Sequence, residues 1–137
     1  MAVRVSWDND EKTIMHYQFD DNWTWEEFFP AKARAYEMIS TVTHKVGVIL
    51  ETQHNGVIPH NLLINFRNGM RTKHPNTAIV VIVVTRPFIR TMINTVRALS
   101  PLANVHLEMA STLGQARHMI LDYLPTLQQT SLKQSDY

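Results

Sequence analysis

Short apolar runs alternate along this chain with polar, turn-forming segments, and the longest apolar run lies near its middle. Residues 78–84 read Ala-Ile-Val-Val-Ile-Val-Val, with no polar side chain among them. A continuous β-branched run of this length is typical of a strand that is covered on both faces, as in a parallel sheet between helices. The run is too short to span a membrane. The pattern therefore predicts a central strand over residues 78–84.

Further strands are predicted on both sides of this run. Residues 3–7 alternate between apolar and polar side chains, and a β-rich stretch over residues 13–19 follows a polar turn, so the chain is expected to open with a hairpin. Residues 46–50 form a third predicted strand. Residues 105–109 alternate again, which favours an edge strand with one wet face.

The first helix is predicted to begin at Thr24, because residues 24–27 read Thr-Trp-Glu-Glu, the spacing of a capping box. Pro30 removes a main-chain hydrogen bond, so we expect a kink there and a restart of the helix near Phe29. Adjacent phenylalanines cannot both face one core, so either Phe28 or Phe29 is expected at the surface. The apolar positions of this helix fall on one face: Phe28, Ala31, Ala35, Ile39 and Val42.

Three more helices are expected, each after a predicted strand. They begin at Pro59, at Pro87 and at Ser111 or Thr112, where a proline in the first turn or a hydroxyl cap is favourable. The last of them is expected to end at Pro125, since proline cannot continue the hydrogen-bond ladder.

The resulting order is strand, strand, helix, and then three strand–helix units. This order predicts an α/β domain with a mixed, mostly parallel sheet and right-handed crossovers. A chain of 137 residues suits one such domain over residues 1–124, followed by a polar C-terminal tail over residues 125–137.

Several local motifs accompany this order, and together they resemble a known family. They are Trp7-Asp8 at the end of the first strand, Trp23-Thr24-Trp25-Glu26-Glu27, Arg86-Pro87-Phe88, and Ser111-Thr112-Leu113-Gly114-Gln115-Ala116. In this order they resemble the STAS domain, the anti-sigma-factor-antagonist fold, and more narrowly its stand-alone branch that is grouped with Sec14-type lipid-binding domains. The resemblance covers about residues 3–124.

The resemblance implies a signalling module that works through protein contacts, with one important departure. Phosphorylated antagonists of the family carry an Asp-Ser pair followed by Gly at the start of the second helix. Here residues 57–61 read Val-Ile-Pro-His-Asn, without a hydroxyl, and the nearest one belongs to Thr52. The phospho-switch of the family is therefore not expected. The Sec14 relationship implies a second function, the binding of a small apolar ligand or lipid.

The candidate binding site is predicted from the topology. In an open α/β sheet, ligands usually meet the loops beyond the carboxyl ends of the strands. Here the loops after the third and fourth strands should lie side by side, and the first of them is long and chemically mixed. The predicted ligand- or partner-binding residues are Glu51, Thr52, Gln53, His54, Asn55, Pro59, His60, Thr85 and Arg86.

Two sharper hypotheses for these loops have plainer alternatives. Glu51 and the two loop histidines offer one oxygen and two imidazole nitrogens, but their spacing matches no metal signature, so no metal site is predicted. Arg86 and Arg90 at a helix start could hold an anion. The plainer alternative, which we favour, is that Thr85 caps the helix and Arg86 is solvated.

Composition excludes several classes of function. The absence of cysteine excludes disulfides and thiolate metal sites and fits a reducing compartment. A net charge of +1, with Lys and Arg spread along the chain, gives no reason to expect nucleic acid or an anionic membrane as a partner. The four glycines form no phosphate-binding loop, and no Gly-x-Ser-x-Gly elbow is present, so neither an enzyme nor a cofactor is expected. The start of the chain has no apolar stretch of signal-peptide length, which predicts a cytoplasmic location.

The sequence thus favours a non-enzymatic cytoplasmic regulatory or protein-interaction module. Binding of a small apolar ligand or lipid is the alternative. A cluster of aromatic residues fits either function, by lining a pocket or covering a partner surface, although packing in the core is the plainer role: Trp23, Trp25, Phe28 and Phe29. The surplus phenylalanine and the edge strand at residues 105–109 also predict a homodimer.

Overall fold

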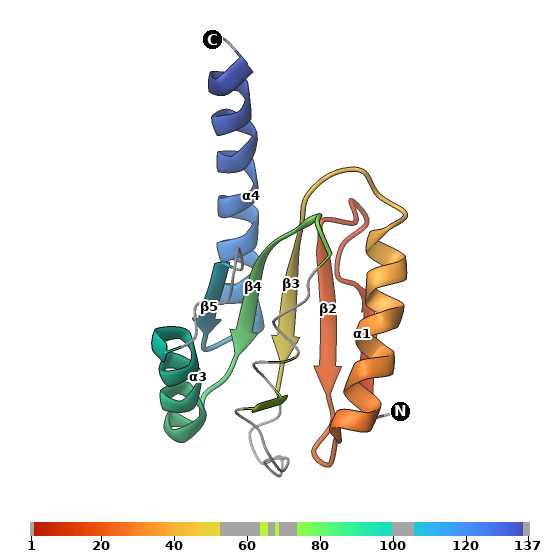
Figure 1. The fold of residues 1–137 in the computed structure, drawn as a ribbon, viewed down its shortest axis with the longest axis vertical. Helices are drawn as coiled ribbons and strands as arrows, with labels where there is room; N and C mark the ends of the chain where they lie inside the picture. Colours follow the sequence, from red (N-terminus) through yellow and green to blue (C-terminus); the bar gives the residue numbers. More distant parts are fainter. Residues whose placement is uncertain (1, 53–63, 66–67, 69–73, 100–105, 136–137) are drawn as a thin grey trace.

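The computed structural model describes residues 2–52, 64–65, 68, 74–99 and 106–135 (Figure 1). In these residues the chain forms five strands and three helices. In chain order they are β1 (Val3–Trp7), β2 (Ile14–Phe19), α1 (Trp25–Ile39), β3 (Val46–Glu51), β4 (Thr77–Val83), α3 (Pro87–Leu99), β5 (His106–Ala110) and α4 (Leu113–Ser135).

The five strands form one sheet in sequence order, β1-β2-β3-β4-β5. The opening hairpin is antiparallel, and each later strand is parallel to its neighbour. The predicted α/β class and the mixed, mostly parallel sheet are therefore confirmed. The predicted edge position of the last strand is confirmed too, because β5 ends the sheet opposite β1.

Helices cover the two faces of the sheet in an unequal way (Figure 1). One face carries the larger core cluster, in which α1 packs through Phe28 and Ala35 and α3 packs through Ile93. The other face is covered by α4, which lies over β3, β4 and β5. Since α1 and α3 connect successive parallel strands on the same face, their two crossovers share one hand. Right-handed crossovers are by far the commoner form in such sheets.

The central strand β4 is buried on both faces, as its sequence predicts. Val80 and Ile82 belong to the cluster beneath α1 and α3, and Ile79 and Val81 belong to the cluster beneath α4. The alternation along the strand therefore decides which core each residue enters, although every position is apolar.

The start of α1 follows the predicted capping box. The side chain of Thr24 accepts a hydrogen bond from the main-chain N–H of Glu27, and the carboxylate of Glu27 accepts one from the N–H of Thr24 at 3.1 Å. The prediction for the two phenylalanines also holds, since Phe28 is 5% exposed and Phe29 is 40% exposed.

Two prolines lie inside helices, so the predicted restart near Phe29 and the predicted helix end at Pro125 were wrong. Helix α1 runs through Pro30 without a restart, and α4 runs through Pro125 instead of ending there. Both prolines are exposed, and the residues four positions earlier, Glu26 and Leu121, are exposed as well. Each ring and the carbonyl it leaves unpaired thus lie on the solvent side of the helix, where water can replace the lost hydrogen bond.

Helix α4 extends into the predicted C-terminal tail. The backbone is helical over residues 125–135, where the sequence predicts a polar tail. At about 1.5 Å per residue, the 23 residues of α4 span roughly 35 Å. The seven residues of β4 span about 23 Å. The second half of α4 therefore projects beyond the sheet (Figure 1).

The approach of α4 to the sheet depends on one glycine. Gly47 is the second residue of β3, and it is buried beneath Ile120 of α4. A Cβ atom on Gly47 would lie 2.9 Å from Cδ1 of Ile120 and closer still to Cγ2. Isoleucine in a helix has one strongly preferred χ1 rotamer, so Ile120 cannot turn away easily.

We predict that Gly47→Ala destabilises the fold by about 1–3 kcal/mol, because the added methyl overpacks the contact between β3 and α4. Urea unfolding measures this change. Gly114→Ala is the matched control, since no atom lies within 4 Å of a Cβ placed there. Combining Gly47→Ala with Ile120→Ala should destabilise less than the sum of the two single changes. Additive effects would show that the two residues do not oppose each other in this way.

Candidate functional site

The sheet brings part of the predicted binding site together at its carboxyl edge. Glu51 is the last residue of β3 and lies opposite Val83, the last residue of β4. Thr52 follows β3 directly, and Thr85 and Arg86 follow β4. These four predicted residues therefore share one edge. The other five lie outside the described residues: Gln53, His54, Asn55, Pro59 and His60.

Thr52 ties the ends of the two strands together. Its hydroxyl donates a hydrogen bond of 2.8 Å to the carbonyl oxygen of Val83, and its main-chain N–H donates to the same oxygen at 3.4 Å. The strand pairing thus extends one residue past β3, and the Thr52 hydroxyl is engaged within the protein. The beginning of the loop after β3 is fixed by these bonds.

The turn from β4 into α3 is fixed in a similar way. The guanidinium of Arg90 donates to the carbonyl oxygen of Val84 at 3.1 Å, and its main-chain N–H donates to Arg86 at 3.1 Å. Helix α3 begins at Pro87, as predicted, with Thr85 exposed and Arg86 half-buried. Arg90 therefore braces the turn. Thr85 and Arg86 therefore lie in a turn whose backbone Arg90 fixes.

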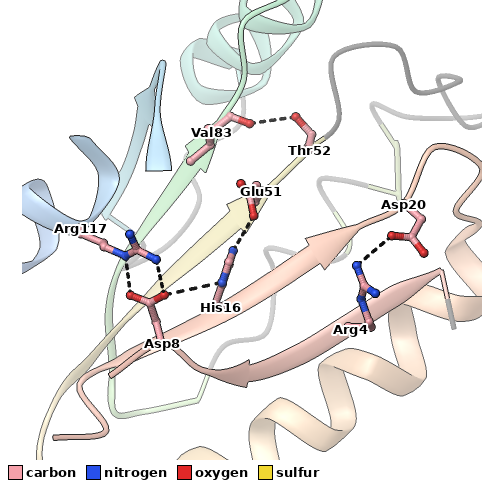
Figure 2. A network of polar contacts seen from close by, with 8 residues as sticks. All are labelled: Arg4, Asp8, His16, Asp20, Glu51, Thr52, Val83 and Arg117. Atoms are coloured by element: carbon pink, nitrogen blue, oxygen red, sulfur yellow. Dashed lines mark hydrogen bonds and ion pairs between the residues drawn. The ribbon is translucent and has the colours of Figure 1, made fainter. Parts of the chain in front are cut away.

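A polar network that the sequence did not predict runs across the face of the sheet on which α4 lies (Figure 2). At its centre is His16 of β2, whose side chain is 6% exposed. Nε2 of His16 lies 2.8 Å from Oε1 of Glu51, and Nδ1 lies 3.7 Å from Oδ1 of Asp8. Arg117 of α4 reaches Asp8 from the other side, with Nε–Oδ2 and Nη2–Oδ1 distances of 2.7 Å and 2.9 Å.

The geometry around His16 assigns its hydrogen. An ionised carboxylate only accepts hydrogen bonds, so Nε2 carries the hydrogen that is donated to Glu51. Nδ1 is too far from Asp8 for a direct hydrogen bond. Each ring nitrogen faces a carboxylate of the protein, and the ring is nearly inaccessible to solvent. This histidine is therefore placed to hold the network together.

The same geometry bears on metal binding. The two carboxylates approach opposite edges of the imidazole ring of His16, so they do not converge on one point. Over the described part of the chain, no three His, Asp or Glu side chains are grouped so that they could hold a metal ion.

The ion pair with Arg117 favours the ionised form of the Asp8 carboxyl group. The two parallel hydrogen bonds from Arg117 hold the pKa of Asp8 below its usual value of 3.8. Burial opposes this shift, and the positive charge of Arg117 supports it. In turn, the Asp8 carboxylate raises the pKa of Arg117. The pair links α4 to the hairpin of β1 and β2, 109 positions apart in the sequence.

One local signal could have pointed to this network. His16 interrupts a strand in which Met15 and Tyr17 are buried, and it is buried itself. A buried histidine in a strand needs polar partners, so His16 predicts that some exist. Their identity does not follow, because Asp8 lies in a turn and Glu51 lies on another strand, 35 positions further along the chain.

The predicted aromatic cluster packs mainly against itself. The ring centroids of Trp23 and Trp25 lie 4.7 Å apart, and Trp25 contacts Phe28 edge-on at 5.5 Å. Phe19 of β2 extends the cluster toward the sheet with a 4.8 Å contact to Trp23. Phe29 is its exposed end. Trp23 and Trp25 are thus partly buried against one another and against the core.

Comparison with protein-family models, with curated proteins and with solved structures finds no significant match to this chain. In the described part of the chain, no helix combines the length and the apolar character that crossing a membrane requires.

We predict that Arg117→Ala destabilises the protein by about 2 kcal/mol at neutral pH, because it leaves a nearly buried carboxylate without its strongest partner. Arg117→Lys should recover only part of this loss, since lysine cannot form the two parallel bonds. Urea unfolding at neutral pH compares these variants with His118→Ala, a change of an exposed neighbour on the same helix.

The effect of Arg117→Ala should depend on acid in a defined direction. Because the folded state lowers the pKa of Asp8, its contribution to stability is complete above about pH 4 and is lost as the pH falls through the lowered value. The stability difference between wild type and Arg117→Ala should therefore shrink at about pH 3. A difference that stays constant with pH would contradict the assigned role of Asp8.

Proposed function

We propose that this chain is a non-enzymatic, cytoplasmic regulatory module of the STAS-like type, and that it binds a protein partner through the carboxyl edge of its sheet. The observation that carries the proposal is the fixed juxtaposition of two strand ends. Glu51 ends β3, and Thr85 and Arg86 follow β4. The bond from Thr52 to Val83 holds these ends together. Acidic, hydroxyl and basic groups on a rigid apolar support are the usual form of a recognition site.

The order of the described elements supports the STAS-like assignment. An antiparallel hairpin, a helix and then parallel strands that alternate with helices is the order that the resemblance implies. The absence of a hydroxyl in residues 57–61 distinguishes the chain from phosphorylated members of that family. We therefore propose that its interactions are regulated by binding alone, without phosphorylation at that place.

Two features of the described residues favour a binding role over an enzymatic one. The imidazole of His16 is enclosed between carboxylates of the protein, and its side chain is nearly inaccessible to solvent. The Thr52 hydroxyl is bonded to a main-chain oxygen. Groups of the kinds that serve as base and nucleophile are thus engaged in structural contacts.

The aromatic cluster bears on the alternative function, binding of a small apolar ligand or lipid. A Sec14-type pocket would need apolar surface directed at the ligand. Here the rings of Trp23, Trp25 and Phe28 contact one another, and Trp25 meets each of the other two edge-on. We therefore rank a protein partner above an apolar ligand.

Native mass spectrometry of the protein isolated from its own cells tests the proposal. We predict a complex with a protein partner, and binding should weaken about tenfold in the double variant Thr85→Ala/Arg86→Ala. Thr85 is exposed and Arg86 is half-buried, so urea unfolding of the double variant should accompany the binding measurement, to show that the protein is still folded. Arg34→Ala, a change of a half-buried arginine on α1, is the matched control and should bind as wild type does.

Two outcomes would contradict the proposal. A bound small apolar molecule in one-to-one ratio would favour the alternative function. A partner that binds the double variant normally but is lost with Phe29→Ala would move the site from the carboxyl edge to α1.

A further inference from the structure

A second polar cluster lies at the opposite, amino edge of the sheet, where α1 ends and β4 is about to begin. Ser40 is the C-cap residue of α1, and its hydroxyl donates to the carbonyl oxygen of Tyr36 at 2.9 Å. The same hydroxyl oxygen lies 3.0 Å from Nε2 of His74. On the other side of the ring, the main-chain N–H of Asn76 donates to Nδ1 of His74 at 3.0 Å. We call these three residues, Ser40, His74 and Asn76, the amino-edge clasp.

The hydrogen bonds of the clasp fix the protonation of His74. Ser40 has one hydroxyl hydrogen, and Tyr36 receives it, so Ser40 must accept from His74. Nε2 therefore carries a hydrogen. Nδ1 accepts from Asn76, so it carries none. The clasp thus requires the neutral imidazole with its hydrogen on Nε2.

Asn76 is also hydrogen-bonded to two other segments of the chain. Its carbonyl oxygen accepts from the main-chain N–H of Val46, at the first residue of β3, at 2.8 Å. Its side-chain amide donates to the carbonyl oxygen of Val42 at 3.2 Å. Asn76, which His74 holds, therefore joins the start of β4 to the start of β3 and to the α1–β3 connection.

The surroundings of the ring disfavour a positive charge. Lys45 lies beside the clasp and donates to the carbonyl oxygen of Pro75 at 2.7 Å. Tyr36 of α1 contacts the ring, with centroids 4.5 Å apart. In the described residues, no carboxylate forms an ion pair with His74. Partial burial, and then the charge of Lys45, hold the pKa of His74 below its usual value of 6.5.

We propose that the amino-edge clasp is an acid-sensitive conformational latch, which is closed when His74 is neutral and opens when His74 is protonated. A proton on Nδ1 would face the N–H of Asn76, so the bond between them cannot survive. Asn76 then loses its support, and the amino ends of β3 and β4 loosen. The folded state favours the neutral ring, so the latch contributes fully to stability above about pH 6.5. This contribution is lost as the pH falls through the lower pKa that His74 has in the folded protein.

This latch is independent of the proposed binding function. It lies at the edge of the sheet opposite Thr85 and Arg86, and it needs no partner. A failure of the partner experiment would therefore leave it intact, and a failure of the latch would not affect the carboxyl edge.

Nitrogen NMR of the His74 ring and hydrogen exchange of the Asn76 amide test the latch. At about pH 8 the ring should carry its hydrogen on Nε2. The protection of the Asn76 amide, corrected for intrinsic exchange, should fall about tenfold as the pH is lowered from about 7.5 to about 5. This fall should follow the titration of His74.

Two variants separate the latch from general effects of acid. In His74→Asn, the side-chain oxygen can replace Nδ1 as acceptor but cannot titrate, so the protection of Asn76 should no longer change over this range. His118→Asn alters an exposed histidine on α4 and should keep the wild-type pH dependence. A hydrogen on Nδ1 at high pH, a constant protection of Asn76 in wild type, or the same pH dependence in His74→Asn would each overturn the proposal.

Discussion

The close contact of Ile120 with the main chain of β3 at Gly47 is the constraint on which much of this structure depends. It lets α4 lie directly on β3, β4 and β5 and bury their second face. The position of α4 in turn carries Arg117 to Asp8, across the face that β1 and β2 share with the covered strands. A side chain at position 47 would lift the helix, and both the apolar core and the ion pair would weaken together.

The polar contacts of the sheet divide between its two edges and the face that joins them. At the carboxyl edge, Thr52 and Arg90 brace the strand ends and leave Thr85 and Arg86 at the surface. At the amino edge, Ser40 and Asn76 enclose the ring of His74. The network from Asp8 through His16 to Glu51 crosses the sheet between them. Glu51 belongs both to this network and to the carboxyl edge, so the candidate site is linked to the buried His16.

The sequence predicts the strands well because their burial follows simple periods. The apolar run at β4 and the alternation in β1 each report which faces are covered. The capping box at Thr24 is equally reliable, since its partners are three residues apart. The prolines mislead because the rule that proline ends a helix assumes that nothing replaces the lost hydrogen bond. Pro30 and Pro125 lie on exposed helix surfaces, where water can replace it.

The polar networks could not be predicted in the same way. Parallel pairing of β3 and β4 is enough to bring the ends of the two strands to one edge, so the shared position of Glu51, Thr52, Thr85 and Arg86 follows from topology. The pairing of Asp8 with Arg117 depends on how α4 packs, and the clasp of His74 depends on where α1 ends. Such contacts join residues far apart in the chain, and only the assembled fold brings them together.

We propose that this fold presents a recognition surface at its carboxyl edge. The most direct test is photo-crosslinking in cells, with the reactive residue placed at Thr85 in one variant and at Thr43, on the exposed connection at the opposite edge, in another. A recognition surface at the carboxyl edge predicts a discrete protein adduct from position 85 and none from position 43. Adducts of equal yield from both positions, or from position 43 alone, would contradict it.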